Sequence, residues 1–211
     1  NYSRLLENKR LLIIDEAQYI SDISRKAKLM IDNIEPLHII LTGSSSFDLL
    51  QMGAPLMGRS ISYQLFTLSQ QELEAKENLL ETRENLESRL IYGSFPEIIT
   101  LSKSNEKATY LNELINIFLL KDILAFEEIR SPNKIKEILT LLAYQVGSEV
   151  SLNELAKKTG LNKHTINRYL DLLEKTFVVY SLSGYSKNLR KEVSKSKKWY
   201  FYDNGVRNAL I

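Results

Sequence analysis

The chain has 211 residues, of which 44% are hydrophobic and 26% are charged, and its formal net charge is +2. This is the composition of an ordinary globular protein, and the near-neutral charge excludes a uniformly basic nucleic-acid-binding surface while leaving room for local patches. Cysteine is absent, which excludes disulfides and thiolate metal sites, and the two histidines, His38 and His164, are too far apart in sequence to favour an imidazole metal site.

Neither a signal peptide nor an apolar run of about 18 residues is present, so we expect a cytoplasmic protein without a membrane partner. The chain begins at Asn1 without a methionine and stops at Ile211 after the apolar residues ALI. We therefore expect both ends to lie inside a longer protein.

Two short apolar segments, RLLIID (10–15) and LHIILTG (37–43), are rich in Ile and Leu. Such continuous runs are typical of strands that are buried on both faces in parallel α/β sheets. Residues 21–34 between them carry apolar side chains at helical spacing, so the order predicts a βαβ unit. The apolar and polar residues of SISYQLFTL (60–68) alternate, which predicts a third strand.

From Ser69 onwards the pattern becomes helical. The stretch that ends at Gly93 is polar with a sparse apolar stripe, and residues 106–129 form the most apolar predicted helix, ended by Ser131-Pro132. Residues 133–147 form an amphipathic helix with one apolar face.

The first predicted strand ends on two adjacent carboxylates, Asp15 and Glu16. Side chains at the carboxyl end of a parallel strand point into the crevice where ligands bind. One carboxylate there can orient Mg²⁺, often through its waters, and its neighbour can position or polarise an attacking water. The alternative interpretation is a strand followed by an acidic helix N-cap.

The second predicted strand ends on hydroxyls, among them Thr42 and Ser44, which could sense a terminal phosphate or hold the attacking water. Arg59, in MGRS, could reach a phosphoryl group of its own subunit or of a neighbour and stabilise developing charge. Taken singly, TGSSS is more typical of a turn and cap, and Arg59 of a solvated charge.

Residues 149–180 have the features of a helix-turn-helix. Ser151 and Glu154 have the spacing of a capping box, and Gly160 suits the exit from a first helix. We expect the second helix to carry a polar outer face for nucleic acid, made of Lys163, His164, Asn167 and Arg168. A plain helical hairpin is the alternative.

Two strands, predicted at 177–182 and 198–203, follow these helices with a basic connection between them. Helix-turn-helix and hairpin together predict a winged helix whose wing contacts phosphates. The wing candidates are Lys187, Arg190, Lys191, Lys195, Lys197 and Lys198. A solvated lysine-rich loop is the alternative, and Asp171 and Glu174 on the outer helix face favour protein docking over DNA reading.

LLIIDEAQYI resembles the Walker B strand of AAA-type P-loop ATPases, and IILTGSSS resembles their sensor 1 strand. MGRS and the later LFTLSQQEL are similar to the segments after sensor 1 in a prokaryotic family of AAA-like ATPases. The resemblance implies that Asp15 serves Mg²⁺ through water and Glu16 serves the attacking water, that Thr42 or Ser44 is the sensor, and that Arg59 is a finger candidate acting in cis or in trans.

ELAKKTGLNKHTINRYLDLLEKTFVVYSL and KKWYFYDNGVRNAL are similar to the winged-helix domain of unknown function that follows the ATPase in the same family. The phosphate-binding pattern G-x-x-x-x-G-K-[ST] is absent, because no glycine of the chain is followed by lysine. In the family this loop lies upstream of Walker B. We therefore expect ATP and Mg²⁺ to be cofactors of the longer protein, and this chain by itself to bind ATP poorly and to be inactive.

The expected fold class is an α/β P-loop (AAA-type) core with parallel strands over 1–70, a helical connector over 71–132 and a winged-helix (α+β) domain over 133–211. The expected function is ATP binding and hydrolysis, with the winged helix docking to nucleic acid or to a protein partner, in a chain that could also be a homo-oligomer. The alternatives are a DNA-binding transcriptional regulator or a protein-interaction module in which the ATPase half is only a scaffold.

Overall fold

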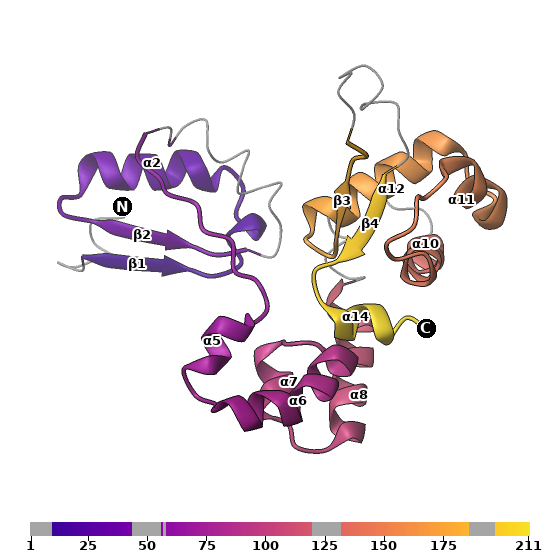
Figure 1. Cartoon of the computed structure of the whole chain (residues 1–211). Helices are drawn as coiled ribbons and strands as arrows, with labels where there is room; N and C mark the ends of the chain where they lie inside the picture. Colours follow the sequence, from indigo (N-terminus) through magenta and orange to yellow (C-terminus); the bar gives the residue numbers. More distant parts are fainter. Residues whose placement is uncertain (1–9, 44–55, 57, 120–131, 186–196) are drawn as a thin grey trace. The chain divides into compact units, whose positions relative to one another are not determined.

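A computed structural model of the chain describes residues 10–43, 56, 58–119, 132–185 and 197–211 (Figure 1). The chain divides into two compact units, residues 1–64 and 65–211. In the described part of the chain, no helix is both long and apolar enough to cross a membrane.

The first unit contains a parallel pair of strands joined by a helix. β1 (Leu11–Ile14) pairs in parallel with β2 (His38–Leu41), and α2 (Ile23–Asn33) connects them after a short 3-10 turn, η1 (Ala17–Tyr19). The register sets Ile14 opposite Leu41. The predicted βαβ unit is therefore confirmed.

Helix α2 covers one face of this strand pair. Its buried residues Ile23 and Met30 belong to two small clusters that also include Leu12 and Leu41. The alternation of a strand turns every second side chain to the opposite face. There Leu11, Ile13 and Ile40 are 51%, 60% and 48% exposed, so the expectation that both faces are buried is wrong for the described residues.

The predicted third strand at 60–68 is also not found, because these residues adopt no regular secondary structure. A strand is defined by a ladder of hydrogen bonds to a neighbouring strand, and in the described residues this segment pairs with no strand, although the Leu68 N–H donates to the Ser94 carbonyl at 2.9 Å. The apolar and polar alternation of the sequence is present, but alternation alone does not pair a strand.

The described residues of the second unit form helices and one antiparallel strand pair. Its helices are α5 (Gln70–Glu74), α6 (Leu79–Tyr92), α7 (Pro96–Thr100), α8 (Ser104–Glu113) with the π-helical turn η2 (Leu114–Leu119), α10 (Pro132–Tyr144), α11 (Leu152–Thr159), α12 (Lys163–Lys175) and α14 (Asn204–Asn208). β3 (Val179–Leu182) pairs in antiparallel fashion with β4 (Lys198–Phe201). The two predicted strands are thus confirmed over shorter ranges.

Local signals explain where several of these helices begin. Asn78 and Glu81 form a complete capping box at the start of α6, which divides the single predicted helical stretch into α5 and α6. At α11 only half of the predicted box forms. The Ser151 hydroxyl accepts from the Glu154 N–H, while the Glu154 carboxylate pairs with Lys158 at 2.8 Å.

The main core of the chain lies where α10, α11, α12 and the hairpin meet. Residues from all of these elements are buried in it, among them Leu139, Leu155, Leu173 and Val179 with 0% exposure. The apolar face predicted over 133–147 is therefore confirmed as the buried face of α10. Burial of this face is the main favourable contribution to folding of the unit.

The short helix α14 is bound to the rest of the unit by the carboxylate of Asp203. One oxygen accepts the N–H groups of Gly205 and Val206, at 2.8 and 3.3 Å, and so caps the helix. The other oxygen accepts the N–H of Ser94, 109 positions earlier in the chain, at 2.8 Å. A single side chain therefore joins the start of α14 to the segment that follows α6.

The contact between α14 and the end of α6 is too close for side chains on its glycines. A Cβ on Gly205 would lie 2.1 Å from the carbonyl oxygen of Tyr92, and one on Gly93 would lie 1.9 Å from the Asp203 carboxylate. Gly93 also has a φ of 77°, which residues with a side chain rarely adopt. Backbone therefore packs directly on backbone at this junction.

Replacing Asp203 by alanine should lower the free energy of unfolding by about 2–4 kcal/mol, because three backbone N–H groups lose their acceptor in a buried position. Urea denaturation of the chain measures this loss. Asp171→Ala is the matched control, because Asp171 lies on the surface of α12, where it pairs with Lys175. The control should lose less than about 1 kcal/mol. Equal losses would show that the junction contributes no more than a surface ion pair.

Candidate functional site

The first candidate site lies where β1 and β2 end. Asp15 and Glu16 follow β1, and Thr42 follows β2. The Thr42 hydroxyl donates to the Asp15 carboxylate, and the Glu16 N–H donates to the Thr42 hydroxyl at 3.3 Å. The backbone N–H of Ala17 also donates to the Thr42 carbonyl, at 2.8 Å. The structure thus brings together three of the residues predicted from the sequence.

This arrangement follows from the parallel register. Because Ile14 lies opposite Leu41, the residues that follow each strand leave the sheet at the same edge. Glu16 then adopts a left-handed backbone conformation with a φ of 49°, and the Gln18 amide donates to its carboxylate. Glu16 is the N-cap residue of η1 but makes no side-chain capping bond, so the acidic N-cap interpretation is not realised there.

The chemistry of this edge is that of hard oxygen ligands. The side chains of Asp15, Glu16 and Thr42 are exposed and offer carboxylate and hydroxyl oxygens. In the described part of the chain, no group of three or more His, Cys, Asp or Glu side chains could hold a metal ion. The oxygen ligands of the edge are compatible with Mg²⁺, which prefers such ligands, keeps several of its waters and takes one or two carboxylates from the protein.

Two further residues were predicted for this site, Ser44 and Arg59. Ser44 lies outside the described residues. Arg59 forms an ion pair with Asp32 on α2, and both side chains remain partly exposed. The described structure therefore associates Arg59 with the crossover helix.

The second candidate site is the outer face of α12. Lys163, His164, Asn167 and Arg168 are all exposed, while Ile166 and the other apolar residues of the helix face the core. The four predicted side chains therefore share one solvent-facing side of the helix. The Arg168 guanidinium also lies 5.9 Å from the centre of the Tyr169 ring.

The basic candidates between β3 and β4 are described only in part. Lys197 and Lys198 are exposed at the start of β4, and the Lys197 ammonium lies 5.9 Å from the centre of the Trp199 ring. The other four predicted residues lie outside the described part of the chain: Lys187, Arg190, Lys191 and Lys195.

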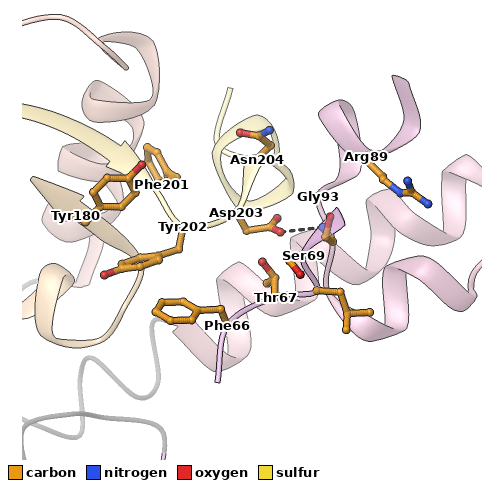
Figure 2. A pocket seen from close by; sticks show the side chains of 12 residues that line it. Phe66, Thr67, Ser69, Arg89, Gly93, Tyr180, Phe201, Tyr202, Asp203 and Asn204 are labelled. Carbon is orange, nitrogen blue, oxygen red and sulfur yellow. Dashed lines mark hydrogen bonds between the residues drawn. The ribbon is translucent and has the colours of Figure 1, made fainter. Parts of the chain in front are cut away.

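A cavity of about 430 Å³ in the second unit contains residues for which we predicted no role (Figure 2). Asp203 lies at its wall with Thr67 close by, and Phe66 stacks on Tyr202 with 5.5 Å between ring centres. Burial raises the pKa of the Asp203 carboxyl, while hydrogen bonds from backbone N–H groups, chiefly that of Ser94, act in the opposite direction.

The function of Asp203 at this cavity is structural, because both of its oxygens already accept backbone N–H groups. Its sequence signal is an acid directly before the helix-forming stretch NGVRN, the ordinary pattern of an N-cap. That pattern predicts the cap, but it carries no information on the second bond, to Ser94.

Comparisons with known proteins agree with a two-part chain. An uncharacterized protein of Haemophilus influenzae is 25% identical over 217 residues, covering 97% of this chain and 53% of that protein. An uncharacterized protein of Mycobacterium tuberculosis is 29% identical over 205 residues, covering 95% and 44%. The chain thus spans about half the length of these curated relatives. No solved structure shows a significant match.

Two family models match consecutive parts of the sequence. The model of an AAA domain matches residues 1–74, which include the edge formed by Asp15, Glu16 and Thr42. A second model, Domain of unknown function (DUF8612), matches residues 83–211, which is more than half of the chain. The chain therefore belongs to the family defined by this domain of unknown function, and in this chain an AAA-domain match precedes it.

Proposed function

We propose that the protein containing this chain is an AAA-like ATPase and that Asp15, Glu16 and Thr42 form the metal-and-water edge of its nucleotide site. The observation that carries this proposal is the bond from the Thr42 hydroxyl to Asp15, beside a second carboxylate at the shared end of two parallel strands. The AAA-domain match over residues 1–74 supports it.

Each residue of the edge has a distinct task in this proposal. Asp15 holds Mg²⁺ through water, and the ion when bound neutralises phosphate charge. Thr42 orients the Asp15 carboxylate through the hydrogen bond between them. Glu16, tethered by the Gln18 amide, positions and polarises the attacking water. Ser44 is the alternative sensor hydroxyl, and Arg59 would stabilise phosphoryl charge after leaving Asp32.

A phosphate-binding loop elsewhere in the protein is part of this proposal, because the 211 residues contain no G-x-x-x-x-G-K-[ST] sequence. Backbone N–H groups of such a loop supply most of the contacts to the phosphates. The 211-residue chain by itself should accordingly bind ATP much more weakly than the whole protein.

In the whole protein, Glu16→Gln should lower the ATP turnover number about 100-fold, because the amide no longer acts as a base toward the attacking water. The dissociation constant for ATP with Mg²⁺ should change less than about threefold, since the Glu16 side chain contributes to reaction more than to binding. A steady-state phosphate-release assay and isothermal titration measure the two quantities.

The matched control is Glu35→Gln, which makes the same substitution at another exposed position of the first unit and should leave turnover unchanged. Turnover by Glu16→Gln equal to that of the control would refute the role of Glu16. A whole protein that binds no ATP would refute the ATPase proposal itself.

We propose as a second function that α11, α12 and the β3–β4 hairpin act as a winged helix that docks to DNA. The observation that favours this is the exposed polar face of α12, where Lys163, Asn167 and Arg168 stand opposite the buried side of the helix. A helix of this kind enters the major groove in helix-turn-helix proteins, and exposed Lys197 and Lys198 would add phosphate contacts. In the alternative, the same face docks to a protein.

The double substitution Lys163→Ala/Arg168→Ala should weaken duplex DNA binding by about tenfold or more at low salt, because two positive charges leave the interface. The slope of log K against log salt should also become less steep, by about one for each phosphate that is no longer neutralised. Fluorescence anisotropy with a labelled duplex at several salt concentrations measures both. Lys103→Ala, which replaces an exposed lysine directly before α8, is the control and should change neither. A wild-type chain that binds no duplex at low salt would leave protein docking as the function of this face.

A further inference from the structure

Helix α6 turns its apolar residues outward. None of its 14 residues is buried, although it is a regular helix of the second unit. Leu79, Leu80, Leu86 and Leu90 are 80%, 69%, 51% and 54% exposed, and Ile91 is 43% exposed. Scattered exposed leucines are normal on protein surfaces, but a continuous patch marks an interaction surface.

These five side chains form a single face of the helix. With about 100° between successive residues, Leu79, Leu86 and Leu90 fall within roughly 40° of one another, and Leu80 and Ile91 form a second line about 100° around the helix from them. The face extends over about 18 Å along the helix axis. We call this set of five side chains the leucine face of α6.

The opposite side of α6 faces its own unit and is polar. Arg89 forms an ion pair with Glu77, and both side chains are mostly buried. Arg89 also donates to Gln70 at 2.8 Å, and Lys107 donates to Ser88 at 2.9 Å. The usual amphipathic arrangement, apolar side inward, is therefore reversed in α6.

Both ends of α6 are held firmly, so the leucine face keeps a defined position in the unit. The capping box of Asn78 and Glu81 secures the first turn. At the other end, the Asn208 amide donates to the carbonyl oxygens of Leu90 and Ile91, at 2.9 and 2.8 Å. The outward orientation of the apolar side chains of α6 is thus fixed by hydrogen bonds at both ends of the helix, and α6 is not a frayed segment.

Two charged residues lie within the leucine face. On the helical wheel, Arg83 and Glu87 fall between the line of Leu86 and the line of Leu80. Neither forms an ion pair with another described residue. A partner that covers the leucine face must therefore present a carboxylate to Arg83 and a cation to Glu87, since an unpaired charge in an apolar contact is costly.

We propose that the leucine face of α6 is a homodimer interface, on which α6 of a second copy of this chain packs in antiparallel orientation. A two-fold axis near residue 85 sets Arg83 of each copy against Glu87 of the other, so the symmetric dimer contains two such ion pairs. The same register brings Leu79 of one copy to Ile91 of the other and Leu80 to Leu90. The second copy therefore supplies both the apolar and the charged complement that the face requires.

A contact made by one helix from each copy is small compared with the 1,200–2,000 Å² or so of a standard interface. The dimer should accordingly be reversible, with a dissociation constant of the order of micromolar. Sedimentation equilibrium of the 211-residue chain over a range of concentrations should show an apparent mass that rises from that of the monomer to twice that value. A mass that stays monomeric up to about 200 µM, well above this range, would overturn the proposal.

Charge reversal tests the register directly. Arg83→Glu should raise the dissociation constant about tenfold or more, because it sets two pairs of carboxylates against each other, and Glu87→Arg should do the same with two pairs of cations. The double variant Arg83→Glu/Glu87→Arg restores opposite charges across the axis and should return the constant to within about threefold of the wild type. A dissociation constant that is unchanged in both single variants would exclude this interface. A double variant that dissociates as readily as the single variants would exclude it too.

A single cysteine provides a second measurement, because the chain has none of its own. Leu86→Cys places a thiol near the proposed axis, so oxidation should give a disulfide-linked dimer within minutes. Asn112→Cys, exposed on α8, is the control and should remain monomeric. Circular dichroism of every variant checks that helix content is unchanged. A Leu86→Cys thiol that neither cross-links nor reacts with a soluble alkylating reagent would mean that another segment of the chain covers the face, which would also overturn the proposal.

Discussion

The arrangement of the second unit depends on one carboxylate, that of Asp203. Its two oxygens accept N–H groups from two segments separated by 109 positions in sequence. Charge-assisted bonds of this kind are among the stronger hydrogen bonds in proteins. Burial raises the pKa of the Asp203 carboxyl because desolvation opposes its charge, and the hydrogen bonds from the backbone N–H groups act in the opposite direction.

The same junction determines how α6 is presented. Asp203 holds the residue that follows Gly93, Asn208 holds the last carbonyls of α6, and the Arg207 side chain reaches the Ala143 carbonyl at the end of α10 at 3.0 Å. These bonds hold α6 by its backbone, and the polar side chains of its inner face, such as Arg89, hold it as well. Its leucine side chains are therefore not needed to anchor it, and an apolar outer face is compatible with a stable unit.

The elements that could be predicted from the sequence are those whose signals are local. Continuous apolar runs and helical spacing identified the βαβ unit, and the acids that follow the first strand identified the edge completed by Thr42. The polar face of α12 followed from the spacing of its buried residues. Each of these features depends on periodicity or on the direction of a parallel strand. Periodicity and strand direction can both be inferred without knowledge of distant contacts.

The features that could not be predicted depend on contacts far apart in sequence. The stretch from Ser69 to Gly93 was recognised as helical with a sparse apolar stripe, but the stripe was no guide to which side of the helix faces inward. Only the ion pair of Arg89 with Glu77 and the bonds from α14 reveal that side. The prediction of a third strand is wrong for a related reason. Residues 60–68 have the alternation of a strand, but no described strand pairs with them.

The edge at Asp15 and Glu16 shows how much of a site can be organised by a strand pair alone. Thr42 already occupies one oxygen of Asp15, and Gln18 already holds the Glu16 carboxylate. Both carboxylates are therefore oriented by protein groups and need not be ordered by a ligand, which is the condition under which charges act most strongly on a reaction. In the proposed ATPase, the attacking water must share Glu16 with the Gln18 amide. The turnover of the enzyme would therefore depend on how far the Gln18 amide leaves the Glu16 carboxylate free to contact the attacking water.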